Sequence, residues 1–550
     1  MSSQARALLL LLFASASLGA QRAPIPMRPD VSGNVAALSS DHPLATAAGA
    51  DVLKRGGNAI DAAVTMAAVL NVVRPHMNGA GGDMFMLYRE AKTGKVYALN
   101  GSGGAGSTAT PAFFAAKNMT AIPATGILSV SVPGAVRGWA DALARFGTIK
   151  LSQALQPAIR YAQEGFAVSN RLSSDINDEL KKVSADPELA RTFLVNGAAP
   201  KPGTLLKQVD LARSLDLLAA RGPDVFYKGE LAQKIVAFIE KEGGLLVAAD
   251  LAKHASRWQD PIESTYHGNH VLAFPPNTQG VTLLQQLNLA ELTDLGAMGH
   301  NSADYVHTLV EGSKLAYADR DQFVADPAFA QVPLDRLLSK EYAKELRKKI
   351  APTTAASGSP DPARDGNGDT IYLCVIDKDG NAVSWIQSLF ASFGSGRMVP
   401  GTGITLHNRG SLYSLDAAHP NVLVPGKRPY HTLSPAMVLR PDRSLHMVVG
   451  TPGGDGQTQT ITQVINNVML FGMTPQQAIE APRWRSYGRR LGVEPGVSDS
   501  VRAALTARGH SVVVQQPSAE FGGAQAIVVL PNGTKMVGSD FRREAYGIAW

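Results

Sequence analysis

The chain has 550 residues, of which 45% are hydrophobic, 18% charged and 6% aromatic. That apolar content is enough for a sizeable core and excludes disorder of the whole chain. The 52 basic and 46 acidic residues give a net charge of +6, which is too weak to indicate binding to nucleic acid or an anionic membrane. The single cysteine, Cys374, excludes a disulfide within the chain and a cysteine-based zinc site.

Residues 1–20 have the pattern of a secretory signal peptide. Arg6 supplies a positive start, Ala7–Phe13 is an apolar run, and small residues follow up to the expected cleavage after Ala20, or alternatively after Ala16. An N-terminal membrane anchor is the alternative, but the apolar run is shorter than the roughly 20 residues of a membrane span. We therefore expect a soluble protein that is periplasmic or secreted.

The remaining chain predicts strands, then many helices, then strands again. Two helical patterns meet at residues 55–58, where glycine ends one helix and Asn58 caps the next. The later elements are expected as strands at Asp83–Tyr88 and Val96–Asn100, helices at Leu205–Ala220 and Gly229–Glu242, an amphipathic helix at Asp304–Phe323, and strands at Thr370–Ile376, Ala382–Ser388, Ser444–Val449 and Ala526–Leu530. This order favours a layered α+β fold over repeated βαβ units.

Residues 351–369, APTTAASGSPDPARDGNGD, interrupt this pattern because they are almost all small, polar, glycine or proline. That composition is typical of a flexible linker. It ends directly at Thr370, which opens a strand. The chain is therefore divided into a signal peptide at 1–20, a large portion at 21–369 that ends in the linker, and a small portion at 370–550.

Two motifs suggest ligands but lack the context that those ligands require. Gly101–Gly106 fits G-x-G-x-x-G after a strand, yet no acidic residue follows until Asp141, so close backbone packing is favoured over dinucleotide binding. His267 and His270 lie in HGNH without a partner at metal-ligand spacing, which favours a surface loop. We expect neither a metal nor an organic cofactor.

The linker leads into a predicted hairpin, TIYLCVI-DKDG-NAVSWIQS. With a four-residue loop, Ile376 faces Asn381 and Thr370 faces Gln387. A register slip of one residue leaves Thr370 and Ser388 as neighbours at the end of the hairpin. The sequence thus predicts two hydroxyl groups side by side, directly after the linker.

A threonine at this position suits one chemistry in particular. If the peptide bond before Thr370 is cut, the threonine gains an α-amino group with an ordinary pKa near 8, which can accept the hydroxyl proton near neutral pH. One residue then acts as nucleophile and general base, and Ser388 can orient its oxygen. A threonine that merely starts a strand is the alternative.

A second glycine-rich segment, GTPGGDG at residues 450–456, lies between a predicted strand and a predicted helix at Thr458–Leu470. Adjacent glycines at a helix start leave backbone N–H groups free and let a substrate approach closely. Gly453 and Gly454 are therefore candidates for the two donors of an oxyanion hole, with an ordinary strand–helix turn as the alternative.

These pieces occur together and in one order along the chain. The segments are HPLATAAGADVLKRGGNAIDAAV, GAGGDMF, SVPGAVRGW, LQPAIRYAQEGF, LAYADR, GDTIYLCVIDKDGNAVS, PGKRPYHTLSP, GTPGGDGQ and IEAPRW. Over roughly residues 33–540 the sequence resembles the gamma-glutamyltransferase, or glutathione hydrolase, family.

The resemblance implies a four-layer αββα sandwich of the N-terminal-nucleophile hydrolase type, with a helical portion in the large chain. It also implies a zymogen that cuts itself autocatalytically before Thr370, so that one precursor yields a heterodimer of large and small chains. By the same match, Thr370 is the nucleophile and Ser388 is the supporting hydroxyl, where the family often has threonine. Gly453 and Gly454 donate to the oxyanion.

The sequence departs from the family pattern where the glutamyl head group is recognised. Ser102 stands where glutamyl-specific members have arginine, Phe390 where they have asparagine, and Leu412 where they have an acidic residue. His431 and Thr432 replace a pair of serines. The pattern therefore resembles the acylase-like and oxamate-amidohydrolase-like branch of the family.

These departures affect the expected substrate. A buried ammonium group needs a compensating carboxylate, and the matched positions supply none. Arg409 is instead a candidate to bind a carboxylate through two hydrogen bonds, with His431 and Thr432 beside the substrate; a structural arginine is the alternative.

The resulting hypothesis is a self-processing threonine amidohydrolase or acyltransferase of the gamma-glutamyltransferase type. It cleaves gamma-glutamyl or related acyl amide bonds, such as those of glutathione-like small molecules, through an acyl-enzyme on Thr370. One alternative is an amidase for a glutaryl-like or oxamate-like acyl group. Another is an unprocessed binding protein on the same fold. A third, nucleotide-dependent oxidoreduction, would rest on Gly101–Gly106 alone.

Overall fold

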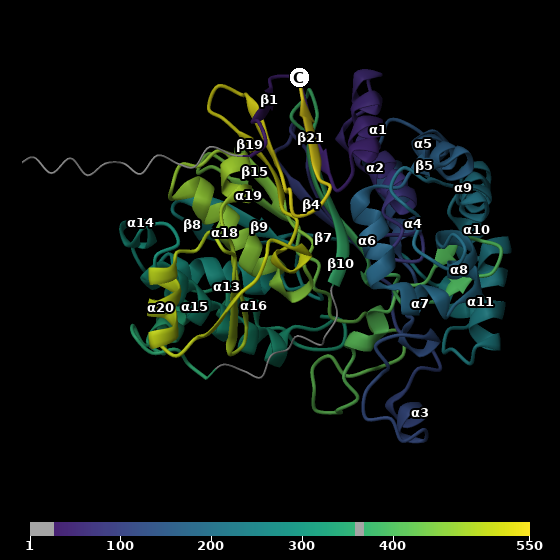
Figure 1. Cartoon of the computed structure of the whole chain (residues 1–550). Helices are drawn as coiled ribbons and strands as arrows, with labels where there is room; N and C mark the ends of the chain where they lie inside the picture. Colours follow the sequence, from purple (N-terminus) through teal and green to yellow (C-terminus); the bar gives the residue numbers. More distant parts are fainter. Residues whose placement is uncertain (1–26, 358–367) are drawn as a thin grey trace, which may run out of the picture.

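The computed structural model describes residues 27–357 and 368–550. Two seven-stranded sheets face each other, and helices cover the outer face of each sheet, which gives four layers (Figure 1). The expected αββα sandwich is therefore present. The signal peptide expected at 1–20 and most of the linker lie outside the described residues.

The first sheet carries the strand that starts at the linker. Its order is β21 (Tyr546–Ala549), β2 (Ala37–Ser40), β10 (Gly368–Ile376), β11 (Ala382–Ala391), β3 (Asp83–Arg89), β4 (Val96–Gly101) and β7 (Arg257–Gln259). All neighbouring strands in this sheet are antiparallel. Because β10 and β11 are central, their ends are shielded by strands on both sides.

The second sheet is assembled from both ends of the chain. Its order is β1 (Val31–Gly33), β20 (Lys535–Ser539), β19 (Gln525–Val529), β15 (Leu445–Gly450), β14 (Ala436–Leu439), β9 (Asn269–Ala273) and β8 (Ile262–Tyr266). Smaller pairings join β5 (Phe166–Ala167) with β6 (Leu205–Leu206), β12 (Met398–Val399) with β13 (Ile404–Thr405), and β16 (Trp484–Tyr487) with β17 (Arg490–Val493) and β18 (Ser511–Val514).

Helices on the side of the first sheet come almost entirely from residues before the linker. They are α1 (Pro43–Lys54), α2 (Ala59–Val73), α3 (Pro111–Ala115), α4 (Ala135–Phe146), α5 (Leu151–Glu164), α6 (Asn170–Asp178), α7 (Leu180–Ser184), α8 (Pro187–Phe193), α9 (Val209–Arg221), α10 (Asp224–Tyr227), α11 (Glu230–Lys241) and α12 (Ala248–Ala252). The helix α2 is buried along its whole length against β10 and β11. Asn58 caps it together with Asp61, as the sequence predicts for Asn58.

Helices on the side of the second sheet come from both portions of the chain. They are α13 (Gly280–Ala290), α14 (Leu295–Met298), α15 (Ala303–Phe323), α16 (Leu334–Leu337), α17 (Lys340–Arg347), α18 (Gln457–Met469), α19 (Pro475–Glu480) and α20 (Asp499–Ala507). The large and small portions thus share one core.

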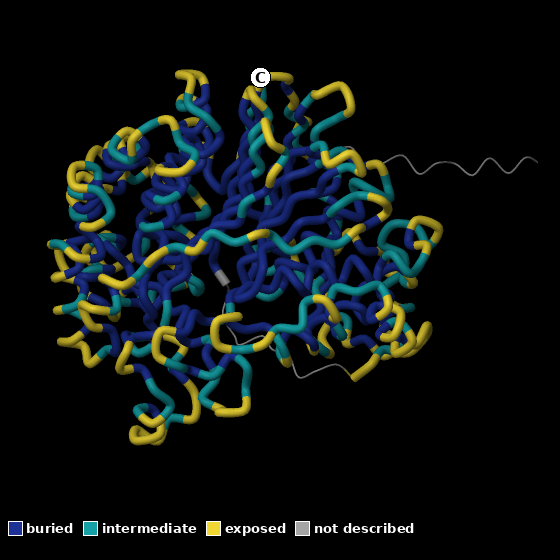
Figure 2. Tube along the Cα trace, turned by 180° about the vertical axis from the view of Figure 1, so that it is seen from behind, coloured by how far each residue is buried: buried dark blue, intermediate teal, exposed yellow. Residues whose placement is uncertain are grey.

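Hydrophobic side chains fill the space between the two sheets. Phe85 and Tyr372 from the first sheet pack with Met437 and Ile527 from the second. Figure 2 shows the buried strands at the centre and exposed residues mainly at the periphery. This packing fixes the two sheets relative to each other, so residues at their ends can form one site.

The expected elements are present with shifted bounds, and three details of the prediction are wrong. The helix expected at Leu205–Ala220 begins only at Val209, because Leu205–Leu206 form β6. The helix at Ala303–Phe323 is buried on most of its surface rather than along one stripe, because it lies between α13 and α20 as well as β16.

The third correction concerns the hairpin register. Ile376 pairs with Ala382, and Thr370 pairs with Ser388, one residue away from the expected partners. The cause is the loop, which has five residues because the N–H of Asp377 donates to the carbonyl of Asn381 and its carboxylate accepts from the Asn381 N–H. The slip leaves Thr370 and Ser388 adjacent.

The two ambiguous motifs have structural roles. Side chains at Gly103 and Gly106 would collide with the carbonyl oxygens of Val132 and Leu245, at 1.8 and 1.9 Å from the added carbon, so these glycines permit close backbone packing. His267 is exposed in the β8–β9 turn. Within the described residues, no helix is long and apolar enough to cross a membrane.

Candidate active site

Thr370, Ser388 and the carbonyl group of Asp369 are linked by hydrogen bonds at the start of β10. The Thr370 hydroxyl donates to Ser388 Oγ at 3.1 Å, and Ser388 Oγ donates to the carbonyl oxygen of Asp369 at 2.8 Å. The N–H of Phe390 donates to the same Ser388 oxygen at 2.7 Å. Ser388 therefore joins the expected nucleophile to the peptide group that precedes it.

A local irregularity in the hairpin brings these groups together. The β10–β11 pairing shifts between Asp369 and Thr370, so that Asp369 pairs with Phe390 while Thr370 pairs with Ser388. Phe390 has a φ of 80°, a left-handed conformation that bulky residues rarely adopt. The bulge points the backbone N–H of Phe390 at Ser388 instead of at a strand partner.

A row of polar side chains continues across the sheet from Thr370. Ser388 pairs with Thr370 on one side and with Asp83 of β3 on the other. Directly paired residues point to the same face, with Cβ atoms about 5 Å apart. Asp83 thus lies on the same face of the sheet as Thr370, about 10 Å from it by two such steps.

Asp83 lies at the centre of a buried polar cluster with His407, Arg409 and His431. The distances from Asp83 Oδ2 are 3.6 Å to His407 Nδ1, 3.8 Å to Arg409 Nε and 3.8 Å to His431 Nε2. All four side chains are fully buried. We call these four residues the polar chamber.

Hydrogen bonds assign the protonation of His407. Its Nδ1 accepts from the N–H of Arg409 at 3.0 Å, so the proton resides on Nε2, which donates to the Ser131 carbonyl at 3.0 Å. Burial also lowers the pKa of His407 below 6.5. His407 is therefore neutral and fixes the backbone direction at Arg409.

Burial shifts the pKa of every ionisable group in the polar chamber. It raises the pKa of Asp83, against the influence of His407 and Arg409, and lowers the pKa of Arg409 to about 10. The pKa of His431 is well below 6.5, because of burial first and Arg409 second. At neutral pH, Arg409 is charged and His431 is neutral.

Several atoms of the polar chamber have no hydrogen-bond partner among the described residues. They are Asp83 Oδ2, Arg409 Nε and Nη2, and both ring nitrogens of His431. Buried polar atoms without partners are costly, so such a concentration marks a place where a ligand or ordered water completes the bonding. The Nε–Nη2 edge of arginine is the edge that binds a carboxylate through two hydrogen bonds.

Phe390 lies between the polar chamber and the junction at Thr370, the expected nucleophile. The Arg409 guanidinium lies 4.5 Å from the centre of the Phe390 ring, and Arg409 Nη1 donates to Thr432 Oγ1 at 3.5 Å. Since the Phe390 N–H contacts Ser388, the chamber and the Thr370 junction share this residue. Arg409, His431 and Thr432, which the sequence nominated separately, are thus brought together.

Gly453 and Gly454 lie in the turn between β15 and α18. Their φ values of 129° and 57° are positive, which favours glycine at both positions. The turn at Gly454–Gly456 packs against β10, and the Gly454 carbonyl accepts from the Gln279 side chain at 3.2 Å. The glycine pair is therefore held beside β10, the strand that contains Thr370.

Sequence reasoning missed Asp83 and His407. Asp83 opens a strand, where a lone aspartate is unremarkable, and the β3–β11 pairing that places it near Ser388 joins residues about 300 positions apart. His407 precedes Arg409 by two positions, and this closeness in sequence was a weak indication that both belong to one site. Ser102, which the resemblance places where glutamyl-specific members have arginine, donates from its hydroxyl to Asn100 Oδ1 at 2.8 Å.

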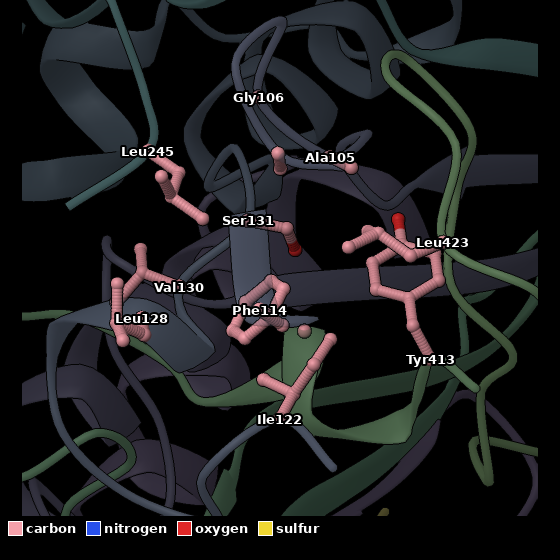
Figure 3. Close-up of a pocket in the computed structure, with 12 residues that line it drawn as sticks. Ala105, Gly106, Phe114, Ile122, Leu128, Val130, Ser131, Leu245, Tyr413 and Leu423 are labelled. Atoms are coloured by element: carbon pink, nitrogen blue, oxygen red, sulfur yellow. The ribbon is translucent and has the colours of Figure 1, made fainter. Parts of the chain in front are cut away.

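A small apolar pocket adjoins the loop that carries the chamber residues (Figure 3). Its empty space is about 250 Å³, including the opening to solvent. Ser131, whose carbonyl accepts from His407, and Gly410, which follows Arg409, form part of its wall. Phe114, Leu245 and Tyr413 make most of the remaining surface apolar.

One group of potential metal ligands lies elsewhere, at His307, Glu311 and His510. The two imidazoles bond to each other at 2.8 Å, and His307 also bonds to the Ala351 carbonyl. The ammonium of Lys314 contacts Glu311 at 2.6 Å. Because these bonds occupy the ligand atoms and a cation is already present, the group fits a structural network better than a metal site.

Comparison with known proteins identifies the family. Residues 45–550 match the family model described as gamma-glutamyltranspeptidase. The glutathione hydrolase-like YwrD proenzyme of Bacillus subtilis (strain 168) is 42% identical over 532 residues, covering 95% of this chain and 100% of the relative. The acylase ACY 1 proenzyme of Pseudomonas sp. (strain SE83) is 36% identical over 548 residues, with coverage of 96% and 97%.

The crystal structure of cephalosporin acylase from Bacillus halodurans has a TM-score of 0.89 and 37% sequence identity, covering 96% of this chain and 98% of that one. Two of these three relatives are named acylases, in agreement with the branch expected from the sequence. Relatives named as proenzymes are consistent with processing into a large and a small chain. The chain therefore belongs to the gamma-glutamyltranspeptidase family and is a self-processing enzyme of that type.

Proposed function

We propose that Thr370 is the nucleophile, both for cleavage of the chain before residue 370 and for hydrolysis of amide substrates. The observation that carries this proposal is the hydrogen-bonded set of the Thr370 hydroxyl, Ser388 Oγ and the Asp369 carbonyl. Ser388 Oγ accepts a hydrogen bond from the attacking Thr370 hydroxyl and donates one to the Asp369 carbonyl oxygen, which belongs to the group that is attacked. Both interactions become stronger as the bond between the threonine oxygen and the carbonyl carbon forms.

Self-cleavage follows in two balanced steps. Thr370 Oγ bonds to the Asp369 carbonyl carbon, the bond from that carbon to the Thr370 nitrogen breaks, and the hydroxyl proton ends on the nitrogen. Water then adds to the resulting ester, which yields a carboxylate on Asp369 and restores the Thr370 hydroxyl. The products are a large chain that ends at Asp369 and a small chain that begins at Thr370.

The new α-amino group of Thr370 supplies the base for substrate turnover. It accepts the hydroxyl proton as Thr370 Oγ attacks a substrate amide, and it returns a proton to the leaving amine. Gly453 and Gly454 are proposed to donate their N–H groups to the oxyanion. Water, or an acceptor amine, then attacks the carbonyl carbon of the acyl-enzyme, which releases the acyl group and restores the Thr370 hydroxyl. No step requires a cofactor.

We infer that the polar chamber binds the head of the acyl group. The unpartnered Nε–Nη2 edge of Arg409 fits a carboxylate, and Asp83 supplies an acceptor for an ammonium group. Asp83 thus provides the carboxylate that the matched sequence positions lack. A γ-glutamyl group, with an α-carboxylate and an α-ammonium, uses both charges and is the first candidate.

A second candidate is an acyl group that has a carboxylate but no ammonium, such as glutaryl. The observation that favours it is the raised pKa of Asp83, because a protonated Asp83 does not repel a second carboxylate beside Arg409. The names of the acylase relatives support the same candidate.

Turnover of γ-glutamyl and glutaryl p-nitroanilides by Asp83→Asn discriminates the candidates. If Asp83 binds an ammonium, the substitution lowers kcat/KM for the γ-glutamyl compound by about 10- to 100-fold and spares the glutaryl compound. Asp224→Asn, which alters an exposed aspartate, is the matched control. A wild-type preference for glutaryl that Asp83→Asn leaves intact favours the second candidate.

The processed protein is proposed to act as a heterodimer of its two chains in the periplasm or outside the cell. The signal-peptide pattern of residues 1–20 supports export. An unprocessed binding protein, the alternative considered from the sequence, disagrees with the proenzyme names of the relatives and would require that the purified chain stay uncut. Sequencing the N-terminus of the purified small chain separates the two.

A further inference from the structure

Arg543 contacts the residue that precedes the expected cleavage point. Its Nη1 donates to Asp369 Oδ1 at 3.1 Å, and the two side chains are only 1% and 12% exposed. A charged hydrogen bond in such a protected position is stronger than an exposed ion pair. The turnover mechanism described above uses neither side chain.

The segment between β20 and β21 aims Arg543 at this position. Asp540 bonds to Arg542, and Glu544 bonds to Arg74 at 2.7 Å, so the residues on both sides of Arg543 are held by ion pairs, of which the first is fully buried and the second is partly exposed at Glu544. Such flanking bonds restrict the backbone before the arginine side chain makes any contact. The direction of Arg543 is therefore set by the fold rather than by Asp369.

The stem of Arg543 also lies against the segment that supports the glycine pair. A side chain at Gly523 would collide with Arg543 Cγ, at 2.3 Å, and would lie 3.2 Å from Pro452 Cγ. The N–H of Gly523 donates to Thr451 Oγ1 at 2.9 Å. Arg543 is thus packed between the scissile junction at Asp369 and the turn that leads to Gly453.

The charge of Arg543 acts on two carboxyl groups, those of Asp369 and Asp41. Burial raises the pKa of Asp41 to about 7. The positive charge of Arg543 is the largest influence in the opposite direction, because it favours the ionised form of Asp41. Cleavage adds a second negative charge to Asp369, at its new α-carboxylate. The Arg543–Asp369 contact therefore has a defined geometry in the uncut chain and a different charge balance afterwards.

We propose that Arg543 is a positioning residue for self-cleavage. By holding the Asp369 side chain, it keeps the Asp369 carbonyl carbon in line with Thr370 Oγ and keeps the carbonyl oxygen at Ser388. It takes no part in bond making or breaking. This inference rests on the proposed function of Thr370 and adds a residue that acts on the precursor more than on the mature enzyme.

Pulse-chase labelling of the precursor made by cell-free translation tests the proposal. Arg543→Gln and Asp369→Asn are each expected to lengthen the cleavage half-time about 10- to 100-fold, the cost of misplacing a reacting group by about 1 Å. The double variant should be no slower than the slower single variant, because each change removes one charge of the same ion pair. Arg543→Lys keeps the cation and should recover part of the rate.

A second readout separates positioning from general damage. The turnover of a γ-glutamyl or glutaryl anilide, divided by the amount of processed small chain, should fall far less than the cleavage rate. Folding is checked by comparing thermal unfolding of Arg543→Gln with its parent, both in the uncut Thr370→Ala background. Equal losses in cleavage and turnover, or wild-type cleavage by Asp369→Asn, would overturn the proposal.

The outcomes also distinguish this inference from the proposed function. If the wild-type small chain does not begin at Thr370, the proposed function fails. If the wild-type chain is cut before Thr370 and the Arg543 and Asp369 variants are cut at the same rate, only the positioning role fails.

Discussion

The junction at Thr370 and the polar chamber at Asp83 differ in how fully their hydrogen bonds are made. At the junction, Ser388 Oγ accepts two hydrogen bonds and donates one, so its bonding is complete before any substrate arrives. In the chamber, Asp83 and Arg409 retain unpartnered atoms among the described residues. Both regions are buried, so exposure to solvent does not account for the difference.

The difference indicates what each region is built to bind. In the proposed mechanism, the junction already contains its reaction partner, the peptide group of Asp369, to which Ser388 Oγ donates. The chamber has charged and polar groups whose partners must come from outside. A variant at the junction should therefore affect self-cleavage most, and a variant in the chamber should affect substrate turnover most.

The largest effect is expected from removal of the nucleophile. Thr370→Ala should leave the chain uncut and lower amide hydrolysis by about 10⁴-fold or more, because both reactions need the same oxygen. Thr370→Ser keeps a hydroxyl and should still be cut. A gel of purified protein and an anilide assay measure both effects, and a cut Thr370→Ala chain would refute the assignment.

The second largest effect is expected from removal of the Ser388 hydroxyl. Ser388→Ala is expected to slow self-cleavage about 100-fold or more, since it removes both the acceptor of the Thr370 proton and a donor to the developing oxyanion. Ser388→Thr restores a hydroxyl and should restore the rate. Cleavage of Ser388→Ala at the wild-type rate would show that the hydrogen-bonded set is not used.

A change in the polar chamber should impair substrate turnover more than self-cleavage. Arg409→Met is expected to lower kcat/KM for a carboxylate-bearing anilide about 100-fold, the loss of a charged hydrogen-bonded pair, while self-cleavage continues. Arg397→Met, which alters a partly exposed arginine, is the control. If Arg409→Met blocks cleavage, or if the processed variant keeps the wild-type kcat/KM, Arg409 supports the fold rather than the substrate.

The last test concerns a different quantity, the stability of the uncut chain and its pH dependence. Burial raises the pKa of Asp41 to about 7 from 3.8, so the folded chain retains this proton to higher pH than the unfolded chain. The resulting stabilisation is fully present below pH 3.8 and is lost as the pH rises through about 7. It amounts to at most about 4 kcal/mol.

Asp41→Asn tests this linkage, because asparagine resembles the protonated carboxyl group and does not titrate. Thermal unfolding in the Thr370→Ala background should show a smaller fall in stability between pH 4 and 7 for the asparagine variant than for its parent. Parallel curves for the two proteins would show that Asp41 does not titrate in this range.

Local sequence patterns predicted the strands of the β10–β11 hairpin and the proximity of Thr370 and Ser388. They did not predict the register, because the five-residue loop depends on the specific bonds between Asp377 and Asn381. The family resemblance supplied the αββα layers, which composition and periodicity alone could not assign, and it supported the glycine pair, which the segment GTPGGDG had already nominated.

The chamber was only partly predictable for a physical reason. Arg409, His431 and Thr432 could be nominated from their positions relative to recognised motifs. Asp83 acquires its place through the pairing of β3 with β11, a contact between distant parts of the chain that no local pattern records. The place of the Asp83 carboxyl group beside Arg409 was therefore visible only in the folded structure.

The most direct test of the central claim is N-terminal sequencing and intact mass measurement of the chains in freshly purified protein. The proposed mechanism predicts a small chain that begins at Thr370 and a large chain that ends at Asp369, with neither chain released from Thr370→Ala. A single uncut chain, or a small chain that begins at another residue, would contradict it.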